Sequence, residues 1–269
     1  MSTRNIEKNN FLEWFIGFSE GDGSFQVVCQ NVINKATRPV FIINQKDRQI
    51  LFKIKKNLKC GSVTGPYQNK SSKSSYYRFR IGDRKGIRTL INIFNGRLVL
   101  SKTKSRFQLF LKSYNNLAQV QKFNQSIRLK DTLCFPSFKN AWLSGFIDAE
   151  GSFSGYTKFK NNELKGVAIK ISLVQKNEQP IFLKLQALLG GSLHFDGTIS
   201  RLTIEGVKDR ELLLNYLKTY PLQSVSKSVA FTRFKKLHVR LTDGQFKWRT
   251  ASRRAKERII RLVKNINIS

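Results

Sequence analysis

Hydrophobic positions along the chain alternate between blocks of helical spacing and blocks of period two. In the first half of the chain they predict helix, two strands, helix, two strands, helix. Polar turns separate the blocks, Asp47 is placed to cap the second helix, and Gly61 to end it. The predicted elements span about residues 10–19, 24–31, 38–44, 48–60, 62–68, 75–82 and 84–94, with a further helix from about residue 102.

The second half repeats this order. Its predicted strands span about residues 152–159, 166–174, 192–195 and 198–205, and its helices about 178–189, 209–219, 227–238 and 245–265. The letters repeat too: W-F-I-G-F-S-E-G-D-G-S-F at 14–25 returns as W-L-S-G-F-I-D-A-E-G-S-F at 142–153, and Q-K-D at 45–47 as Q-K-N at 175–177. This self-similarity indicates a duplicated unit of about 110 residues.

The duplication predicts an α+β fold of two pseudo-symmetric αββαββα units, each with an antiparallel sheet. We expect a first repeat over residues 1–112 with a polar tail over about 1–9, a linker over 113–138, and a second repeat over 139–269 that ends in a basic helix. Small residues one helical turn apart, Gly17 with Gly21 and Gly145 with Ala149, predict that the two motif helices cross closely and pack the units together.

Each motif helix ends in two carboxylates, Glu20 and Asp22 in the first copy and Asp148 and Glu150 in the second. Acids at a helix C-terminus oppose the macrodipole and cost stability. Because this costly arrangement is written twice, we expect it to serve function. A crossing of the two helices would bring Asp22 and Glu150 together, where paired carboxylates suit a divalent metal that activates water.

Charge indicates the partner. The chain of 269 residues has 49 Lys and Arg against 17 Asp and Glu, a formal net charge of +32. Such an excess favours a polyanion, with nucleic acid ahead of a membrane surface. No apolar stretch approaches the ~20 residues of a spanning helix. The first ten residues are polar, so no signal peptide is expected.

The metal is expected to be a hard cation. Three cysteines, Cys29, Cys60 and Cys134, share no C-x-x-C spacing, and His194 and His238 stand apart. A zinc site or disulfide framework is therefore disfavoured, and reduced thiols are the simpler interpretation. Oxygen ligands would favour Mg²⁺, with Mn²⁺ or Ca²⁺ able to occupy the same site.

The doubled motif resembles that of the LAGLIDADG homing endonucleases in their single-chain form. The resemblance covers nearly the whole chain and implies sheets that form a DNA-binding saddle. It maps the metal-binding acids onto Asp22 and Glu150, and gives Glu20 and Asp148 a structural role. Copy one departs from the commoner spelling, with Glu20-Gly21-Asp22, but both carboxylates survive.

The resemblance also implies four supporting site residues. Gln45 and Gln175 match a polar position near the metal-bound waters, and Lys102 and Lys227 match a basic residue beside the scissile phosphates. Such groups could orient water and stabilise developing negative charge. Hydrogen bonding at a helix start is the alternative for the glutamines, and a solvated surface role for the lysines.

The strands predict a base-reading surface. If Phe25, Val27 and Cys29 pack under the sheet, the alternate side chains point away from the core. The candidate DNA contacts from both repeats and their flanks are Ser24, Gln26, Val28, Gln30, Arg38, Val40, Lys46, Tyr76, Arg78, Arg80, Ser152, Ser154, Tyr156, Lys158, Lys160, Ala168, Lys170, Ser172, Arg201 and Thr203. Polar and cationic groups of this kind can contact base edges and phosphates.

These observations predict a monomeric, metal-dependent homing endonuclease that cuts both strands of a long, asymmetric DNA site. An eight-residue strand rises roughly 26 Å, so two sheets would cover about 16 base pairs or more. The resemblance implies intron mobility and organellar residence. The alternatives are a maturase that binds its intron RNA to assist splicing, and a catalytically silent DNA-binding regulator.

Overall fold

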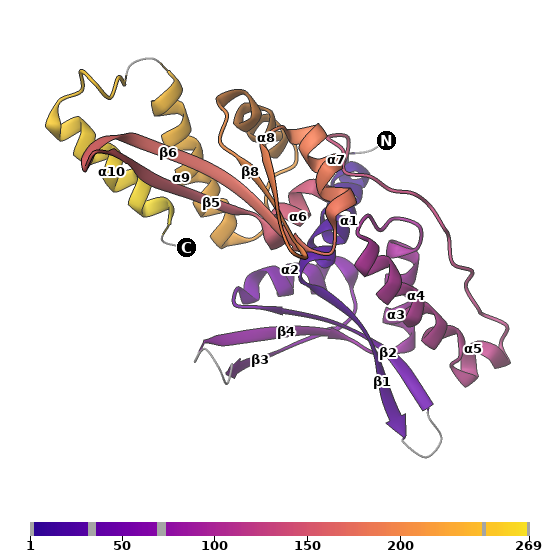
Figure 1. The fold of residues 1–269 in the computed structure, drawn as a ribbon. Helices are drawn as coiled ribbons and strands as arrows, with labels where there is room; N and C mark the ends of the chain where they lie inside the picture. The colour runs from indigo at the N-terminus through magenta and orange to yellow at the C-terminus, as the bar shows by residue number, and fades with distance from the viewer. Residues whose placement is uncertain (1–2, 32–35, 69–73, 244–245, 268–269) are drawn as a thin grey trace. The chain divides into compact units, whose positions relative to one another are not determined.

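The chain forms two units of similar construction in a computed structural model (Figure 1), which describes residues 3–31, 36–68, 74–243 and 246–267 and the side chains of these except at 3, 4, 30, 31 and 36. Contacts divide the chain into Met1–Ala149 and Glu150–Ser269. Each unit contains a four-stranded antiparallel sheet with helices packed on it. The predicted α+β fold of two repeated units is therefore confirmed.

The first unit follows the predicted element order. Its sheet has the strand order β1-β2-β4-β3, and Figure 1 shows its helices gathered on one side of that sheet. The elements are α1 (Thr3–Asp22), β1 (Gly23–Asn31), β2 (Ala36–Gln45), α2 (Arg48–Leu58), β3 (Ser62–Gln68), β4 (Ser75–Ile81), α3 (Arg84–Phe94), α4 (Ser101–Asn115), α5 (Ala118–Lys122) and α6 (Trp142–Glu150).

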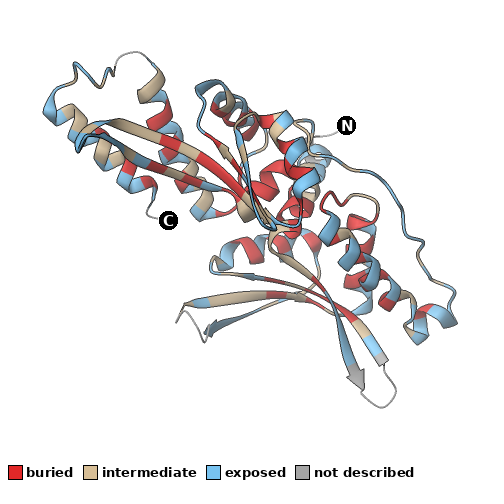
Figure 2. Ribbon diagram, in the orientation of Figure 1, coloured by how far each residue is buried: buried red, intermediate tan, exposed pale blue. Residues whose placement is uncertain are grey.

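An aromatic cluster forms the core of this unit. The ring of Phe25 on β1 lies 5.0 to 5.4 Å, centroid to centroid, from the rings of Phe41, Phe94, Phe107 and Phe110. Edge-to-face packing of this kind adds to the large apolar area that phenylalanines bury. The cluster fastens β1 and β2 to α3 and α4, so the strand that directly follows Asp22 is anchored near its start. Figure 2 shows buried residues on both the strands and the helices of this unit.

The outer end of β1 differs from the prediction. Val27 and Cys29 were expected to pack beneath the sheet, but Val27 is 41% exposed and Cys29 is also exposed. β1 is an edge strand, so its side chains have a neighbouring strand on one side only. The period-two pattern is followed at Phe25 and lost beyond it.

The segment after α4 is fastened to the first unit by side-chain amides. Asn115 donates to the carbonyl of Ile127 (2.9 Å) and accepts from its N–H (3.0 Å). Asn95 likewise donates to Arg128 O (2.9 Å) and accepts from Lys130 N (2.8 Å). Residues 123–141 contain no helix or strand. These two-way bonds imitate strand pairing and hold the part of this segment from Ile127 to Lys130 against the unit. At the other end of the unit α1 begins at Thr3, so most of the expected N-terminal tail is helical.

The second unit has the strand order β5-β6-β8-β7. Its helices α9 and α10 pack on β5, and α7 packs on β7 and β8. The elements are β5 (Ser152–Lys160), β6 (Glu163–Lys176), α7 (Gln179–Leu189), β7 (Ser192–Asp196), β8 (Ile199–Ile204), α8 (Val207–Thr219), α9 (Val225–Thr242) and α10 (Arg253–Ile266).

The closing helix is shorter than predicted. Residues 246–252 are not helical, and α10 begins only after Ser252, whose hydroxyl accepts a hydrogen bond from Ala255 N (3.2 Å). Serine is a preferred N-cap residue, so the helix begins directly after Ser252. At the far end, the Asn267 amide makes a two-way bond with Gly155 of β5, at 2.8 and 3.1 Å. In the part of the chain that is described, no helix is long and apolar enough to cross a membrane.

Candidate active site and nucleic-acid interface

The two motif helices cross within the first unit at a pair of glycines. A Cβ placed on Gly17 would stand 1.9 Å from the carbonyl oxygen of Trp142, and one on Gly145 would stand 1.9 Å from that of Trp14. The backbones of α1 and α6 are therefore in direct contact. The close crossing predicted from the small residues is observed at these two positions.

Two tryptophan–carboxylate bonds hold this crossing in a reciprocal way. The indole N–H of Trp142 donates to Glu20 (2.6 Å), and that of Trp14 donates to Asp148 (2.8 Å). Each bond joins the first residue of one motif to the earlier acid of the other. Glu20 and Asp148 are only 4% and 3% exposed, and a buried carboxylate needs such donors.

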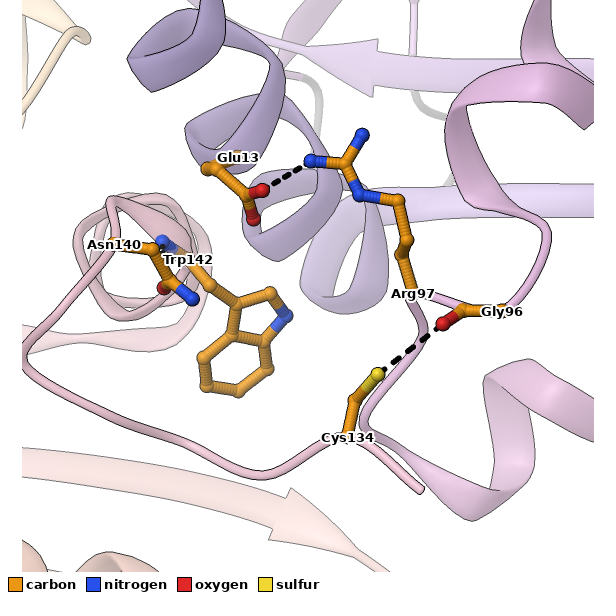
Figure 3. Close-up of polar contacts among 6 residues, drawn as sticks. All are labelled: Glu13, Gly96, Arg97, Cys134, Asn140 and Trp142. Carbon is orange, nitrogen blue, oxygen red and sulfur yellow. Dashed lines mark hydrogen bonds and ion pairs between the residues drawn. The ribbon is translucent and has the colours of Figure 1, made fainter. Parts of the chain in front are cut away.

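The segment after α3 supplies further donors to Glu20. The backbone N–H groups of Val99 and Leu100 approach its carboxylate at 3.0 and 2.7 Å. Figure 3 shows how this segment is held: Arg97 forms an ion pair with Glu13 of α1, and the Cys134 thiol donates to the carbonyl of Gly96 at 3.3 Å. Glu20 thus accepts hydrogen bonds from one indole and two backbone N–H groups of the first unit.

We expect Trp14→Phe to lower the free energy of unfolding by about 1–3 kcal/mol, because it removes a donor from the buried carboxylate of Asp148. Urea-induced unfolding measures the change. The control is Trp248→Phe, whose indole bond to Leu164 O is long at 3.4 Å and whose loss should change stability little. Unchanged stability of the Trp14 variant would contradict the role given to this bond.

The later acid of each motif has a different environment. Asp22 and Glu150 are half-buried, and each accepts a hydrogen bond from a glutamine amide of its own unit. Gln45 Nε2 lies 2.5 Å from Asp22 Oδ2, and Gln175 Nε2 lies 3.0 Å from Glu150 Oε1. The same acid–amide pair therefore occurs at the same place in both repeats, where a motif helix gives way to the first strand of a sheet.

Lys227 lies beside the second acid–amide pair. Its ammonium donates to the carbonyl of Gly151, the residue next to Glu150, so α9 brings a cation to the end of the motif. Lys102 occupies the corresponding region of the first unit as the second residue of α4, and it is exposed. The structure thus places Lys227 against the residue that follows Glu150, and the catalytic roles of Lys227 and Lys102 both stay predictions.

The outward face of the second sheet carries most of its predicted contacts together. Strand register sets Ser154 opposite Lys170 and Tyr156 opposite Ala168, and Thr203 opposite Ser172. The Lys170 ammonium lies 5.5 Å from the centre of the Tyr156 ring. The candidates that are exposed or half-buried here are Ser152, Ser154, Tyr156, Lys158, Lys160, Ala168, Lys170, Arg201 and Thr203.

The first sheet has a comparable face, with a side-chain network that the sequence did not reveal. The Arg78 guanidinium donates from Nε to Asn44 Oδ1 (3.0 Å) and lies 5.2 and 5.9 Å from the rings of Tyr67 and Tyr76. Asn44 and Tyr67 were not among the candidates, although their positions at strand ends were visible. The exposed or half-buried candidates are Ser24, Gln26, Val28, Arg38, Lys46, Tyr76, Arg78 and Arg80.

Two expected contacts are corrected by burial. Val40 is 1% exposed and Ser172 is 5% exposed, so neither side chain is free to touch a ligand. Both residues lie on central strands. Val40 pairs with Gln26 of β1, and Ser172 pairs with Ser152 of β5 on one side and Thr203 of β8 on the other. The Gln30 side chain lies outside the described residues.

Each of the two half-buried acids, taken by itself, could serve as a ligand of a hard divalent cation. Among the described residues no three His, Cys, Asp or Glu side chains gather as a complete metal-ligand set. Mg²⁺ does not need one, since it is usually held by one or two carboxylates together with waters and substrate phosphates. Asp22 and Glu150 offer oxygen, are not enclosed by the core, and are oriented by amide donors.

Comparison with known proteins identifies the family. The sequence profile described as LAGLIDADG endonuclease matches residues 15–114 and 143–238, which include both motifs and most of both sheets. The chain belongs to the LAGLIDADG endonuclease family. The two matched ranges coincide with the two repeats, so the family assignment and the internal duplication support one another.

Relatives within the LAGLIDADG family are intron-encoded proteins. A probable intron-encoded endonuclease 4 of Neurospora crassa is 36% identical over 227 residues, covering 81% of this chain and 38% of the relative. The intron-encoded RNA maturase bI4 of Saccharomyces cerevisiae is 26% identical over 219 residues, covering 81% of this chain and 30% of the relative. The chain thus spans about a third of the length of these curated relatives.

Solved structures of LAGLIDADG meganucleases share the fold. I-CpaMI bound to uncleaved DNA aligns with a TM-score of 0.73 and 19% identity, covering 96% of this chain and 98% of that one. I-SmaMI bound to uncleaved DNA in the presence of calcium ions aligns with a TM-score of 0.71 and 16% identity, covering 95% and 98%. At this identity the likeness concerns the fold alone.

Proposed function

We propose that this chain is a divalent-metal-dependent homing endonuclease that cuts both strands of a long, asymmetric DNA site and acts as a monomer. The observation that carries the proposal is the acid–amide pair repeated in both units, Asp22 with Gln45 and Glu150 with Gln175. Each acid directly precedes a strand, and most of the outward side chains of that strand are polar or cationic. In both repeats, the residues proposed for catalysis are thus adjacent in the chain to the residues proposed for recognition.

Asp22 and Glu150 would hold the cation, one acid from each repeat. When bound, such a cation supplies a Lewis acid and lowers the pKa of a coordinated water. Gln45 and Gln175 orient the two carboxylates through their amide N–H groups, so each acid presents a defined oxygen to the site. Lys227, and by analogy Lys102, would neutralise the negative charge that develops on the scissile phosphate.

Recognition would follow from the outward sheet faces. Gln26 and Arg80 in the first unit and Lys170 and Arg201 in the second can reach base edges in the major groove. The surrounding lysines and arginines bind phosphates without regard to sequence, so affinity should fall steeply with salt. Because the outward residues differ between the repeats, the two halves of the target should differ as well.

Selection of cleaved sites from a randomised duplex library with Mg²⁺ tests this proposal. We expect one long non-palindromic consensus that is cut on both strands, and no cutting when EDTA replaces the metal. Failure to cut any duplex with Mg²⁺ or Mn²⁺ would overturn the assignment. A short or palindromic consensus would contradict the two-sheet recognition while leaving the nuclease chemistry in place.

A second function, assistance to splicing of an intron RNA, is favoured by the similarity to a protein named as an RNA maturase. It predicts tight intron RNA binding and rescue of splicing, with Glu150→Gln still active because RNA binding needs no metal-binding acid. We also propose intron mobility and organellar residence, since relatives are named as intron-encoded. Splicing rescue without DNA cutting would replace the endonuclease proposal with this one.

A further inference from the structure

Part of the β6 edge in the second unit is not covered by another strand. β5 pairs with β6 as far as Glu163, whereas β8 pairs with it only from Ile171 to Lys176. Two side chains fasten the remaining edge: Arg210 donates to the carbonyl of Ile169 (3.0 Å) and Trp248 to that of Leu164 (3.4 Å). Between these bonds the edge opens into a cavity.

The cavity has a volume of about 380 Å³ and combines positive charge with aromatic walls. Lys158, Lys165 and Arg210 supply the charge, and Phe246 and Trp248 supply the rings. Glu205 is the one carboxylate among its lining residues, and it accepts a hydrogen bond from the Tyr156 hydroxyl (3.1 Å). The other lining residues are Gly166, Val167, Ala168, Ile169 and Leu241.

Arg210 indicates what kind of ligand the cavity would take. Its side chain is 6% exposed, and its Nε has no hydrogen-bond partner among the described residues. Burial lowers the pKa of this guanidinium, although Glu205 and Glu211 act in the opposite direction. A buried guanidinium with one unpaired donor is costly, and the negative charge of an oxyanion in the cavity that Arg210 lines would offset part of that cost.

We propose that this cavity binds one nucleotide unit. Its phosphate would contact Lys158, Lys165 and Arg210, since guanidinium and ammonium groups bind phosphate strongly. Its base would lie against Trp248 and Phe246, because stacking on aromatic side chains accepts any base. Lys165 is now paired with Glu163, but both residues are exposed, so a ligand can displace that weak pair.

Two sources could supply this unit. Lys158 and Ala168 belong to the outward face of the second sheet, so the backbone of a bound DNA target could enter the cavity at the end of its footprint; this source rests on the proposed function. A free nucleotide carries the same chemistry and does not depend on it. The experiment therefore needs a mononucleotide arm and a duplex arm.

The fluorescence of Trp248 reports directly on the cavity. The other two tryptophans, Trp14 and Trp142, are 1% and 3% exposed, so a titration with AMP, or with inorganic phosphate, should change the emission of Trp248 alone. We expect saturable binding that Trp248→Phe makes invisible and that Lys165→Ala weakens about tenfold, the value of one charge-assisted bond. Lys218→Ala, an equal charge change on an exposed part of α8, is the control and should have no effect.

The duplex arm compares the selected target with and without added flanking base pairs. If DNA is the source, Lys165→Ala weakens binding of the longer duplex only; if a free nucleotide is the source, it weakens AMP binding and leaves both duplexes unchanged. Either result supports the cavity. No effect of Lys165→Ala in either arm, or an equal effect of Lys218→Ala, overturns it. The AMP titration tests the cavity even if the chain cuts no DNA.

Discussion

Glu150→Gln is expected to retain target binding and to lose Mg²⁺-dependent cleavage by about 10³-fold or more. The substitution keeps the size of the side chain and its ability to accept from Gln175, but it removes the negative charge that would hold the cation. Binding should persist, because the cationic side chains proposed to contact DNA lie on the outward faces of the sheets. Single-turnover cleavage and a gel-shift titration on one target measure the two effects separately.

Asp22→Asn should reproduce this behaviour, because Asp22 has the same relation to Gln45 as Glu150 has to Gln175. The control is Glu7→Gln, which removes one negative charge from an exposed turn of α1 and should leave both binding and cleavage unchanged. Undiminished cleavage by either motif variant would remove that acid from the proposed metal site. Loss of binding together with cleavage would indicate a folding defect.

Gly17→Ala is expected to destabilise the first unit by about 3 kcal/mol or more. Its Cβ would stand 1.9 Å from the carbonyl oxygen of Trp142, a backbone atom that no rotamer change can move aside. The helices would have to separate, which would stretch the bonds from Trp142 to Glu20 and from Trp14 to Asp148. Thermal unfolding should show a melting temperature lowered by several degrees at the least.

The matched control is Gly166→Ala. Nothing lies within 4 Å of a Cβ at that position, so the same chemical change should leave the melting temperature within a degree or two. Gly145→Ala should behave like Gly17→Ala, because its Cβ would meet Trp14 O at the same distance. Wild-type stability in both motif variants would mean that the close helix crossing is not what holds this unit together.

The repetition in the sequence was sufficient to predict most of the fold. Doubled letters around the motifs located both motif helices, and alternation of hydrophobic residues located the eight strands. Prediction failed where neighbours decide exposure. Val27 follows the buried pattern but lies on an edge strand. Val40 and Ser172 follow the exposed pattern but lie on central strands. Residues 246–252 have helical composition, but the helix begins only after the N-cap residue Ser252.

The four motif acids show the same division between what the sequence predicts and what the folded structure decides. Their spacing marked all of them as a costly and therefore functional set, and resemblance to the LAGLIDADG family separated them into two pairs. The physical reason for the separation is tertiary. Glu20 and Asp148 are buried against indole N–H groups from distant positions, whereas Asp22 and Glu150 stay half-buried beside amides that can orient them.

By itself, then, the sequence determined the duplication and the element order, and it predicts a polyanionic partner and a functional role for the motif acids, because periodicity, charge and repeated letters are local properties of a chain. Only the tertiary structure decided which acids are buried in the core, which outward side chains are covered, and that Arg210 lines a cavity beside the β6 edge. These depend on which segments become neighbours, and burial and hydrogen-bond partners exist only once the chain has folded.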